Sequence, residues 1–110
     1  MITTSISFIT LSPRVVVCPD TIVQVCGEGN YSRIILHDGQ NIIICQTLRI
    51  LQQKLPPEFI RVHKSHLINI RHLSHILRHK KIFVLTNGLR VPIARRRVLQ
   101  IRNGLLNTAN

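Results

Sequence analysis

Four side chains that donate hydrogen bonds stand close together in the segment Phe59–Ile70. They are Arg61, His63, Lys64 and Ser65, and apolar residues on either side of them mark positions that face a core. Phosphate oxygens and the O6 and N7 atoms of guanine are hydrogen-bond acceptors, so this run of donors has the chemistry of a DNA-facing edge. A polar strand end that only meets solvent is the alternative.

A second cluster consists of three successive arginines, Arg95, Arg96 and Arg97. If a helix starts here, the three cannot all face one way, and one or two of them should project outward. The planar guanidinium can hold a phosphate or a guanine edge with two parallel hydrogen bonds. The alternative is a charge run that is merely solvated.

The distribution of charge favours binding to a polyanion. The chain has 15 Lys and Arg against four Asp and Glu, a formal net charge of +11. Residues 61–110 hold eleven of the cations and no acid, whereas four cations and all four acids lie in residues 1–60. A half of the chain whose charged side chains are all positive attracts nucleic acid or an anionic membrane surface.

Histidine is abundant, with five of the six residues between positions 63 and 79. His63 and His66 are three apart, as are His72 and His75, and residues three apart on a strand point to opposite faces. Neither pair can chelate without a turn, and no carboxylate or Cys completes a site nearby. The sequence therefore predicts no metal and no cofactor.

Catalytic motifs and paired cysteines are both missing from the sequence. There is no nucleophile elbow and no glycine loop that would cradle a phosphate, which predicts that the chain is not an enzyme. Cys18, Cys26 and Cys45 are odd in number and form no CxxC pair. Reduced thiols that pack as small hydrophobes are the expectation, and a redox or metal role is the alternative.

Length and composition predict one domain spanning residues 1–110. The apolar fraction of 45% is too high for a disordered tail, and no apolar run is long enough to cross a bilayer. The N-terminal apolar stretch has no preceding basic residue and no evident cleavage site, which predicts no secretory signal and a cytoplasmic location.

Short apolar runs recur about every ten residues with turn residues between them, which predicts a mostly β fold of about ten short, largely antiparallel strands. Asp38-Gly39 and Asn87-Gly88 should each form a tight hairpin, and Gly27–Asn30 a looser loop. The expected strands are Ile6–Thr10, Val15–Val17, Ile22–Cys26, Ser32–His37, Asn41–Cys45, Arg61–His63, Leu67–Ile70, His75–Arg78, Lys81–Leu85 and Leu89–Ile93.

One or two short helices are expected beside these strands. Leu48, Leu51 and Leu55 share one helical face in Thr47–Leu55, where Thr47 can act as the N-cap and Pro56-Pro57 ends the helix. Val98, Ile101 and Leu105 repeat at helical spacing near the end of the chain, although Gly104 weakens that pattern.

Taken in order, several of these segments resemble the LytTR family of DNA-binding domains, the output modules of bacterial transcription regulators. The resemblance covers about residues 22–101, and the spacing Arg61-x-His63-x-Ser65-x-x-x-Asn69 is its most specific part. The segments are Gly29-Asn30-Tyr31, the Leu-x-x-Leu helix that ends Leu55-Pro56-Pro57, Phe59–Asn69, Thr86-Asn87-Gly88 and Val91–Arg96.

The resemblance implies an antiparallel fold of several small sheets, with loops rather than a recognition helix inserted into successive major grooves of double-stranded DNA. It implies DNA contacts at three places, which map to Asn30, Ser32 and Arg33, to His63, Lys64 and Ser65, and to Arg95, Arg96 and Arg97. Asn69 matches a structural asparagine of the family, so it is not expected to contact DNA. Arg49, in the charge-balanced half, is expected to contribute little.

His66 and Ala94 depart from the family, which often has an aromatic residue and a serine there. Family modules usually follow a receiver or sensor domain, so the chain is either a stand-alone regulator with a separate receiver or sensor partner, or a fragment. We expect a monomer in solution that pairs only on repeated DNA half-sites. An RNA-binding β domain and a basic module for a membrane surface or a protein remain alternatives, although Trp is absent and aromatic stacking residues are few.

Overall fold

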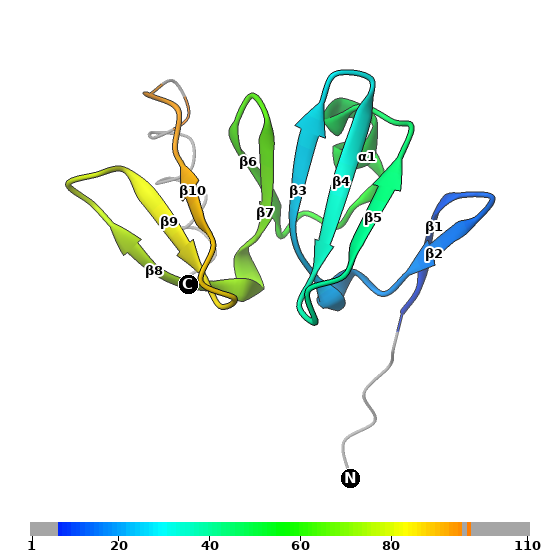
Figure 1. The fold of residues 1–110 in the computed structure, drawn as a ribbon, viewed down its shortest axis with the longest axis horizontal. Coiled ribbons are helices and arrows are strands. Elements are labelled where there is room, and N and C mark those ends of the chain that lie inside the picture. Colours follow the sequence, from blue (N-terminus) through cyan, green and yellow to red (C-terminus); the bar gives the residue numbers. More distant parts are fainter. Residues whose placement is uncertain (1–6, 96, 98–110) are drawn as a thin grey trace, which may run out of the picture.

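The computed structural model describes residues 7–95 and 97, and it is mostly β (Figure 1). This confirms the predicted fold class. Its elements are β1 (Ile9–Ser12), β2 (Val15–Val17), a 3-10 turn (Pro19–Thr21), β3 (Ile22–Glu28), β4 (Tyr31–Leu36), β5 (Asn41–Ile44), α1 (Leu48–Lys54), β6 (Phe59–His63), β7 (His66–Asn69), a second 3-10 turn (Ile70–His72), β8 (Leu73–Leu77), β9 (Ile82–Leu85) and β10 (Arg90–Pro92).

The strands form three antiparallel sheets. A five-stranded sheet has the order β5-β4-β3-β7-β6, a three-stranded sheet the order β10-β9-β8, and β1 pairs with β2 alone. In Figure 1 the three sheets stand side by side, with the five-stranded sheet in the middle. Its central strand β3 is buried from Ile22 to Val25, because other elements cover both of its faces.

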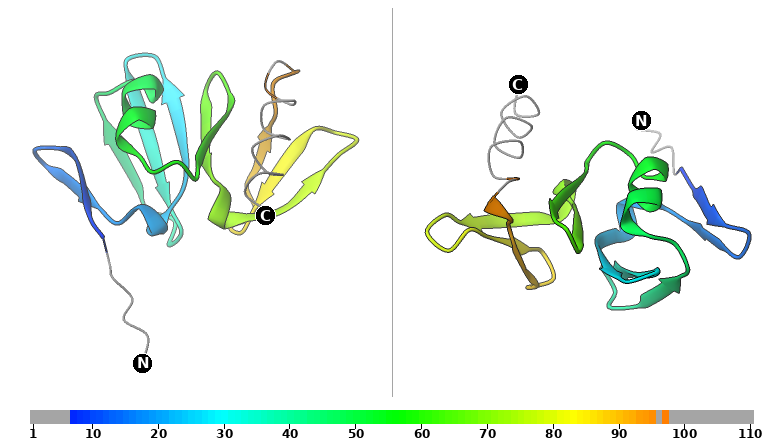
Figure 2. Two further views of the ribbon diagram at one scale, coloured as in Figure 1. Left: turned by 180° about the vertical axis from the view of Figure 1, so that it is seen from behind. Right: turned by 90° about the horizontal axis from the view of Figure 1, so that it is seen from above.

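Two hydrophobic cores lie on opposite faces of the five-stranded sheet. The first packs α1 and the β1–β2 hairpin against the sheet through Leu11, Leu51 and Leu67, among others. The second packs the three-stranded sheet against β6 and β7, with Phe83 and Ile68 as members. Figure 2 shows α1 on one side of the sheet and the three-stranded sheet set apart from it. The middle sheet therefore holds the whole domain together.

Local chemistry explains the helix and the hairpins that the sequence predicts. The Thr47 hydroxyl accepts a hydrogen bond from the backbone nitrogen of Ile50, and the helix ends at Lys54, with Leu55 as its C-cap before the two prolines. Gly39 has a φ of 90° and Gly88 a φ of 86°, the left-handed region that glycine enters without strain. These three predictions are confirmed.

Two local predictions are wrong. The first strand was expected at Ile6–Thr10 but runs over Ile9–Ser12, because pairing of Thr10 with Val16 puts Leu11 into the core. The segment Gly27–Asn30 is not a loose loop. Strand β3 continues to Glu28, which pairs with Tyr31, so that only two residues make the turn. The expected helix around Val98, Ile101 and Leu105 lies outside the described residues.

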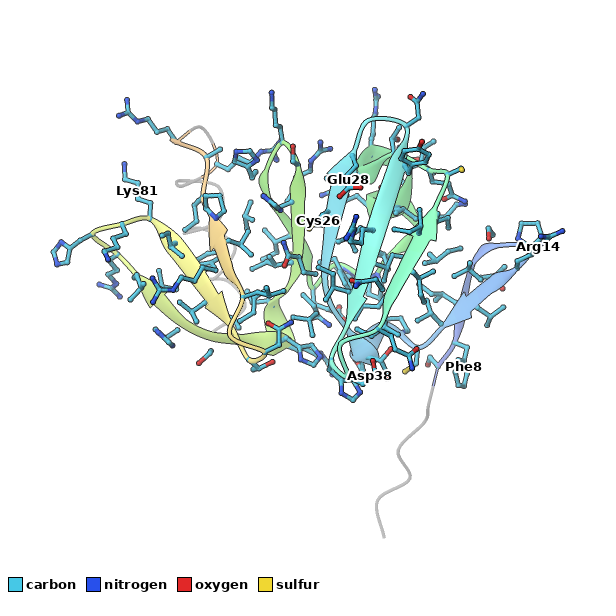
Figure 3. All side chains as sticks on the ribbon, in the orientation of Figure 1. Phe8, Arg14, Cys26, Glu28, Asp38 and Lys81 are labelled. Carbon is cyan, nitrogen blue, oxygen red and sulfur yellow. The ribbon has the colours of Figure 1, made fainter. Side chains whose placement is uncertain are left out.

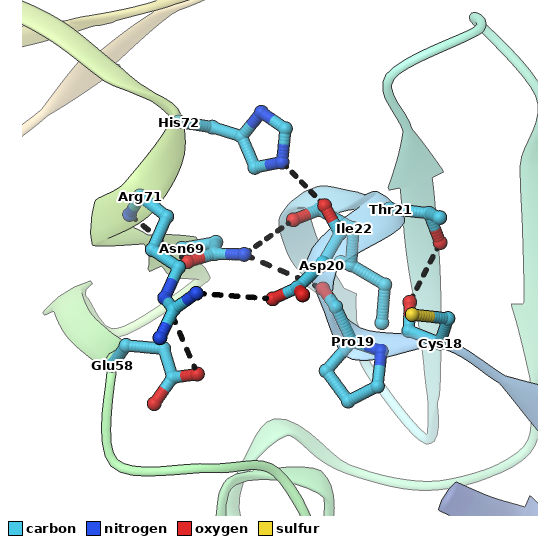
Figure 4. Close-up of polar contacts among 9 residues, drawn as sticks. All are labelled: Cys18, Pro19, Asp20, Thr21, Ile22, Glu58, Asn69, Arg71 and His72. Carbon is cyan, nitrogen blue, oxygen red and sulfur yellow. Dashed lines mark hydrogen bonds and ion pairs between the residues drawn. The ribbon is translucent and has the colours of Figure 1, made fainter. Parts of the chain in front are cut away.

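A polar junction joins the two 3-10 turns at the end of the sheet opposite the β3–β4 turn (Figure 4). Buried Asn69 donates from Nδ2 to the carbonyl oxygens of Ile22, at 3.0 Å, and Pro19, at 3.4 Å, and its Oδ1 accepts from the backbone nitrogen of Arg71. Asn69 is therefore structural, as expected. No helix within residues 7–95 and 97 is long and apolar enough to cross a membrane.

Candidate nucleic-acid interface

Three segments that are distant in sequence meet at one end of the molecule. They are the β3–β4 turn at Gly29–Asn30, the β6–β7 turn at Lys64–Ser65, and Ala94, Arg95 and Arg97 after β10. All three reach the upper edge of Figure 1. We call these segments together the loop end.

Hydrogen bonds hold the three segments to one another. The backbone nitrogen of Gly27, at the end of β3, donates to the carbonyl of Ser65 at 2.8 Å. The backbone nitrogen of Ala94 donates to the carbonyl of Val62, also at 2.8 Å, and Arg97 Nη1 donates to the carbonyl of Arg61 at 3.3 Å. The β6–β7 hairpin is thus the middle member of the loop end, fixed from both sides.

The β6–β7 turn presents His63 and Lys64. Because a backbone N–H can only donate, the hydrogen bond from Ser65 N to His63 Nδ1 at 3.1 Å makes Nδ1 an acceptor. The neutral His63 ring then carries its proton on Nε2, which leaves one donor for a phosphate or base acceptor. The Lys64 side chain is exposed, and its carbonyl is held by Arg61 Nη2.

His66 belongs to the support of this turn. The register places it opposite His63, and the two ring centroids are 5.2 Å apart. Its Nδ1 lies 3.1 Å from Gln24 Nε2, an amide group that can only donate. Burial lowers the pKa of His66 below its usual value, and His63 lowers it further, so His66 is neutral at neutral pH.

The two histidines lie opposite each other because a turn separates them. The argument from sequence required such a turn before the pair could chelate a metal ion. Within residues 7–95 and 97, the structure assembles no group of three or more His, Cys, Asp or Glu side chains that could hold a metal ion.

The β3–β4 hairpin places its three predicted contact residues differently. Asn30 is exposed in the turn. Ser32 is only 1% exposed, and its hydroxyl donates to the carbonyl of Gln46 at 2.6 Å. Arg33 pairs with Glu28 across the hairpin at 3.2 Å. Ser32 is therefore out of reach of a ligand, and the charge of Arg33 is partly compensated.

The arginines after β10 are described in part. The Arg95 side chain is exposed, and Arg97 is half-buried against β6. This division fits the expectation that successive arginines face different ways. Arg96 lies outside the described residues.

Most of the carboxylates lie away from the loop end. Asp20 and Glu58 both pair with Arg71 near the polar junction, at 3.7 and 3.8 Å. Asp38 accepts from the backbone nitrogen of Gln40 in the β4–β5 turn, at the opposite end of the molecule (Figure 3). Glu28 is the acid nearest the loop end, and Arg33 engages it. The cations of the β6–β7 turn and of the segment after β10 therefore have no ion-pair partner among the described acids.

Nothing in the sequence predicts that Arg49 lies close to these cations. Arg49, on α1, lines the same surface hollow as Arg61 and Lys64. Only tertiary packing brings α1 beside the β6–β7 turn, so no spacing rule could have found this neighbour.

The cysteines are free, as expected. Burial raises the pKa of the Cys26 thiol, and Glu28 raises it further, which keeps the thiol protonated. Cys45 is exposed, so the prediction that all three pack as small hydrophobes is wrong for this residue.

The strands define a small antiparallel β domain, and cations of the β6–β7 turn and of the segment after β10 gather at its loop end. The family model of the LytTr DNA-binding domain matches residues 13–105, and the chain belongs to this family. It is therefore a DNA-binding domain of the kind that serves transcription regulation.

A similar solved structure supports the fold. It is the LytTr DNA-binding domain of a putative methyl-accepting/DNA response regulator from Bacillus cereus, with a TM-score of 0.76 and 19% sequence identity. The alignment covers 94% of this chain and 98% of the other. No curated protein matches the chain.

Proposed function

We propose that this chain binds double-stranded DNA sequence-specifically as part of a bacterial transcription regulator, with the turns of the loop end inserted into successive major grooves. The observation that carries the proposal is the fixed arrangement of three donor-rich segments at one end. A DNA edge offers acceptors at the phosphates and at guanine O6 and N7, which this surface matches.

The roles of the residues follow from their placement. His63, Lys64 and Asn30 stand on the turns and are assigned to base edges, as is Arg96 from its position in the sequence. Ser65, Arg95 and Arg97 are assigned to phosphates. Arg33 is assigned a weaker DNA contact because Glu28 competes with DNA for its guanidinium. Ser32 is assigned no contact because it is buried.

The proposed state is a monomer that pairs on repeated half-sites. A single module of this size buries roughly 600–1,000 Å² on DNA, and two copies on one duplex gain avidity without new contacts. The input signal would come from a receiver or sensor partner. A stable dimer in light scattering without DNA would contradict this part of the proposal.

The test is selection of bound sites from random duplexes, followed by affinity measurements on the selected site. Lys64→Ala and Arg96→Ala should each weaken the free energy of DNA binding by about 1–3 kcal/mol and relax the base preference at one base pair. Arg14→Gln is the matched control, because Arg14 is an exposed cation on the β1–β2 turn, away from the loop end (Figure 3). Equal losses for all three variants would mean that the charge acts only diffusely.

Competition separates the other candidate ligands. A selected duplex should outcompete single-stranded RNA of the same length and anionic vesicles at equal charge. Preference for RNA or for vesicles would replace this proposal with the corresponding alternative.

A further inference from the structure

A surface hollow of about 170 Å³ lies between the β3–β4 turn, the start of α1 and the β6–β7 turn. Its volume far exceeds the roughly 10–15 Å³ that one water molecule needs. Arg49, Arg61 and Lys64 line it together with the hydroxyl-bearing Thr47 and Ser65. The hollow therefore combines three cations with room for a small polar ligand.

Arg61 has an unused hydrogen-bond donor. Its Nη2 donates to the carbonyl of Lys64, but its buried Nε has no hydrogen-bond partner among the residues that the structure describes. A buried polar group without a hydrogen-bond partner is unfavourable. Arg33 Nε is also unpaired, but the Arg33 guanidinium reaches Glu28, whereas no described carboxylate forms an ion pair with Arg61.

The charge of Arg61 is also unfavourable in the free protein. Burial lowers the pKa of Arg61, and nearby Arg97 lowers it further. No carboxylate of the described residues lines the hollow, and Arg49 and Lys64 add positive charge of the same sign. An anion placed in the hollow would relieve this repulsion.

The backbone around the hollow leaves space for close approach. Gly29 has a φ of 67°, and a Cβ built on it would meet no atom within 4 Å. Asn30 and Lys64, assigned above to DNA bases, stand on the two turns that border the hollow. A phosphate next to those bases would thus lie within reach of it.

We propose that this hollow is a phosphate subsite, which seats one backbone phosphate of the bound DNA beside the β6–β7 turn. Arg61, Arg49 and Lys64, which all line the hollow, supply the positive charge that holds it. The proposal rests on the proposed function and adds to it a residue, Arg49, from the charge-balanced half of the chain.

Arg49→Gln is the principal test, because Arg49 is exposed and its replacement should leave the fold intact. Arg49→Lys keeps the charge, and Arg14→Gln removes an exposed cation elsewhere. On a selected duplex, Arg49→Gln should reduce the slope of log K against log salt by about 0.9, the value for one phosphate. Arg49→Lys and Arg14→Gln should leave the slope unchanged.

A second measurement locates the phosphate. Each backbone position of the duplex is replaced in turn by a neutral methylphosphonate. One position should weaken binding by the parent chain several-fold and have little further effect on Arg49→Gln, because both changes remove the same contact. Binding of inorganic phosphate by the chain alone is measured in parallel.

The outcomes are distinct. If the parent chain does not bind duplex DNA, the proposed function fails, and this subsite fails with it. If the parent binds but Arg49→Gln behaves like Arg14→Gln at every methylphosphonate position, only the subsite is overturned. If Arg49→Gln loses binding of inorganic phosphate while its salt slope on DNA is unchanged, the hollow takes free phosphate, which also overturns the proposal.

Discussion

Asn69 shows how one buried amide can organise a junction. It is fully buried, and its side chain makes three hydrogen bonds to the backbone around both 3-10 turns. Asn69→Ala would remove these three hydrogen bonds. The Pro19 carbonyl keeps the bond from the Ile22 nitrogen, and each buried group that stays without a partner costs about 1–3 kcal/mol. We expect a loss of at least about 2 kcal/mol in urea unfolding, whereas exposed Ser74→Ala should change the stability by less than about 0.5 kcal/mol.

His66 makes the stability of the domain depend on pH. Its pKa in the folded protein is lowered below the reference value of 6.5, so the unfolded chain binds more protons at acid pH. The contribution of the neutral ring is fully present above about pH 6.5 and is lost as the pH falls below it. The free energy of unfolding should therefore decline on acidification.

The test of His66 is comparative, because the chain has five other histidines. His66→Gln keeps an acceptor for Gln24 but cannot titrate, so its unfolding free energy should fall less between about pH 7.5 and 5.5. His79→Gln, at an exposed turn position, is the control and should retain the slope of the parent. Equal slopes for His66→Gln and the parent would show that His66 does not contribute.

Among the elements, helix α1 packs closely against the end of β3. A Cβ at Gly27 would lie 2.9 Å from Leu48 Cγ, and Leu48 is buried. Gly27→Ala should push α1 away and destabilise the domain by about 1–3 kcal/mol. Thermal or urea unfolding measures this loss.

A double-mutant cycle isolates the contact. Leu48→Ala makes room for the new Cβ, so Gly27→Ala should lower the free energy of unfolding less in that background than in the parent. Gly29→Ala is the matched control, since it introduces strain at a φ of 67° but meets no neighbour. Its cost should add to that of Leu48→Ala. Additive costs for Gly27→Ala would contradict the packing account.

Elements that depend on local chemistry were predictable from the sequence. The helix at Thr47–Leu55 and the hairpins at Gly39 and Gly88 rest on a capping hydroxyl and on glycine's tolerance of positive φ. The placement of β1 was not predictable in the same way, because pairing with β2 sets its register and puts Leu11 in the core.

The site was predictable to the extent that its residues lie in one segment. The donors of the β6–β7 turn are adjacent in sequence, and the turn indeed presents His63 and Lys64. The burial of Ser32 by Gln46 and the position of Arg49 beside Arg61 depend on packing between distant segments. No periodicity or motif in a single sequence carries that information.

On the scale of the whole molecule, charge is separated along the sheet. Three of the four acids lie toward the end with the polar junction and the β4–β5 turn, and the fourth is paired with Arg33. The β3–β4 and β6–β7 turns of the loop end lie at the other end of the sheet (Figure 1). Such polarity orients a polyanion toward one edge and speeds its capture at low salt.

The salt dependence of duplex binding tests the central claim most directly. If roughly 5–8 phosphates are neutralised per domain, log K plotted against log salt should have a slope of about −5 to −7. The measurement uses the parent chain on a selected duplex, with Lys64→Ala expected to bind more weakly at every salt concentration. A slope near zero for the parent would contradict the account that the basic turns of the loop end bind the DNA backbone.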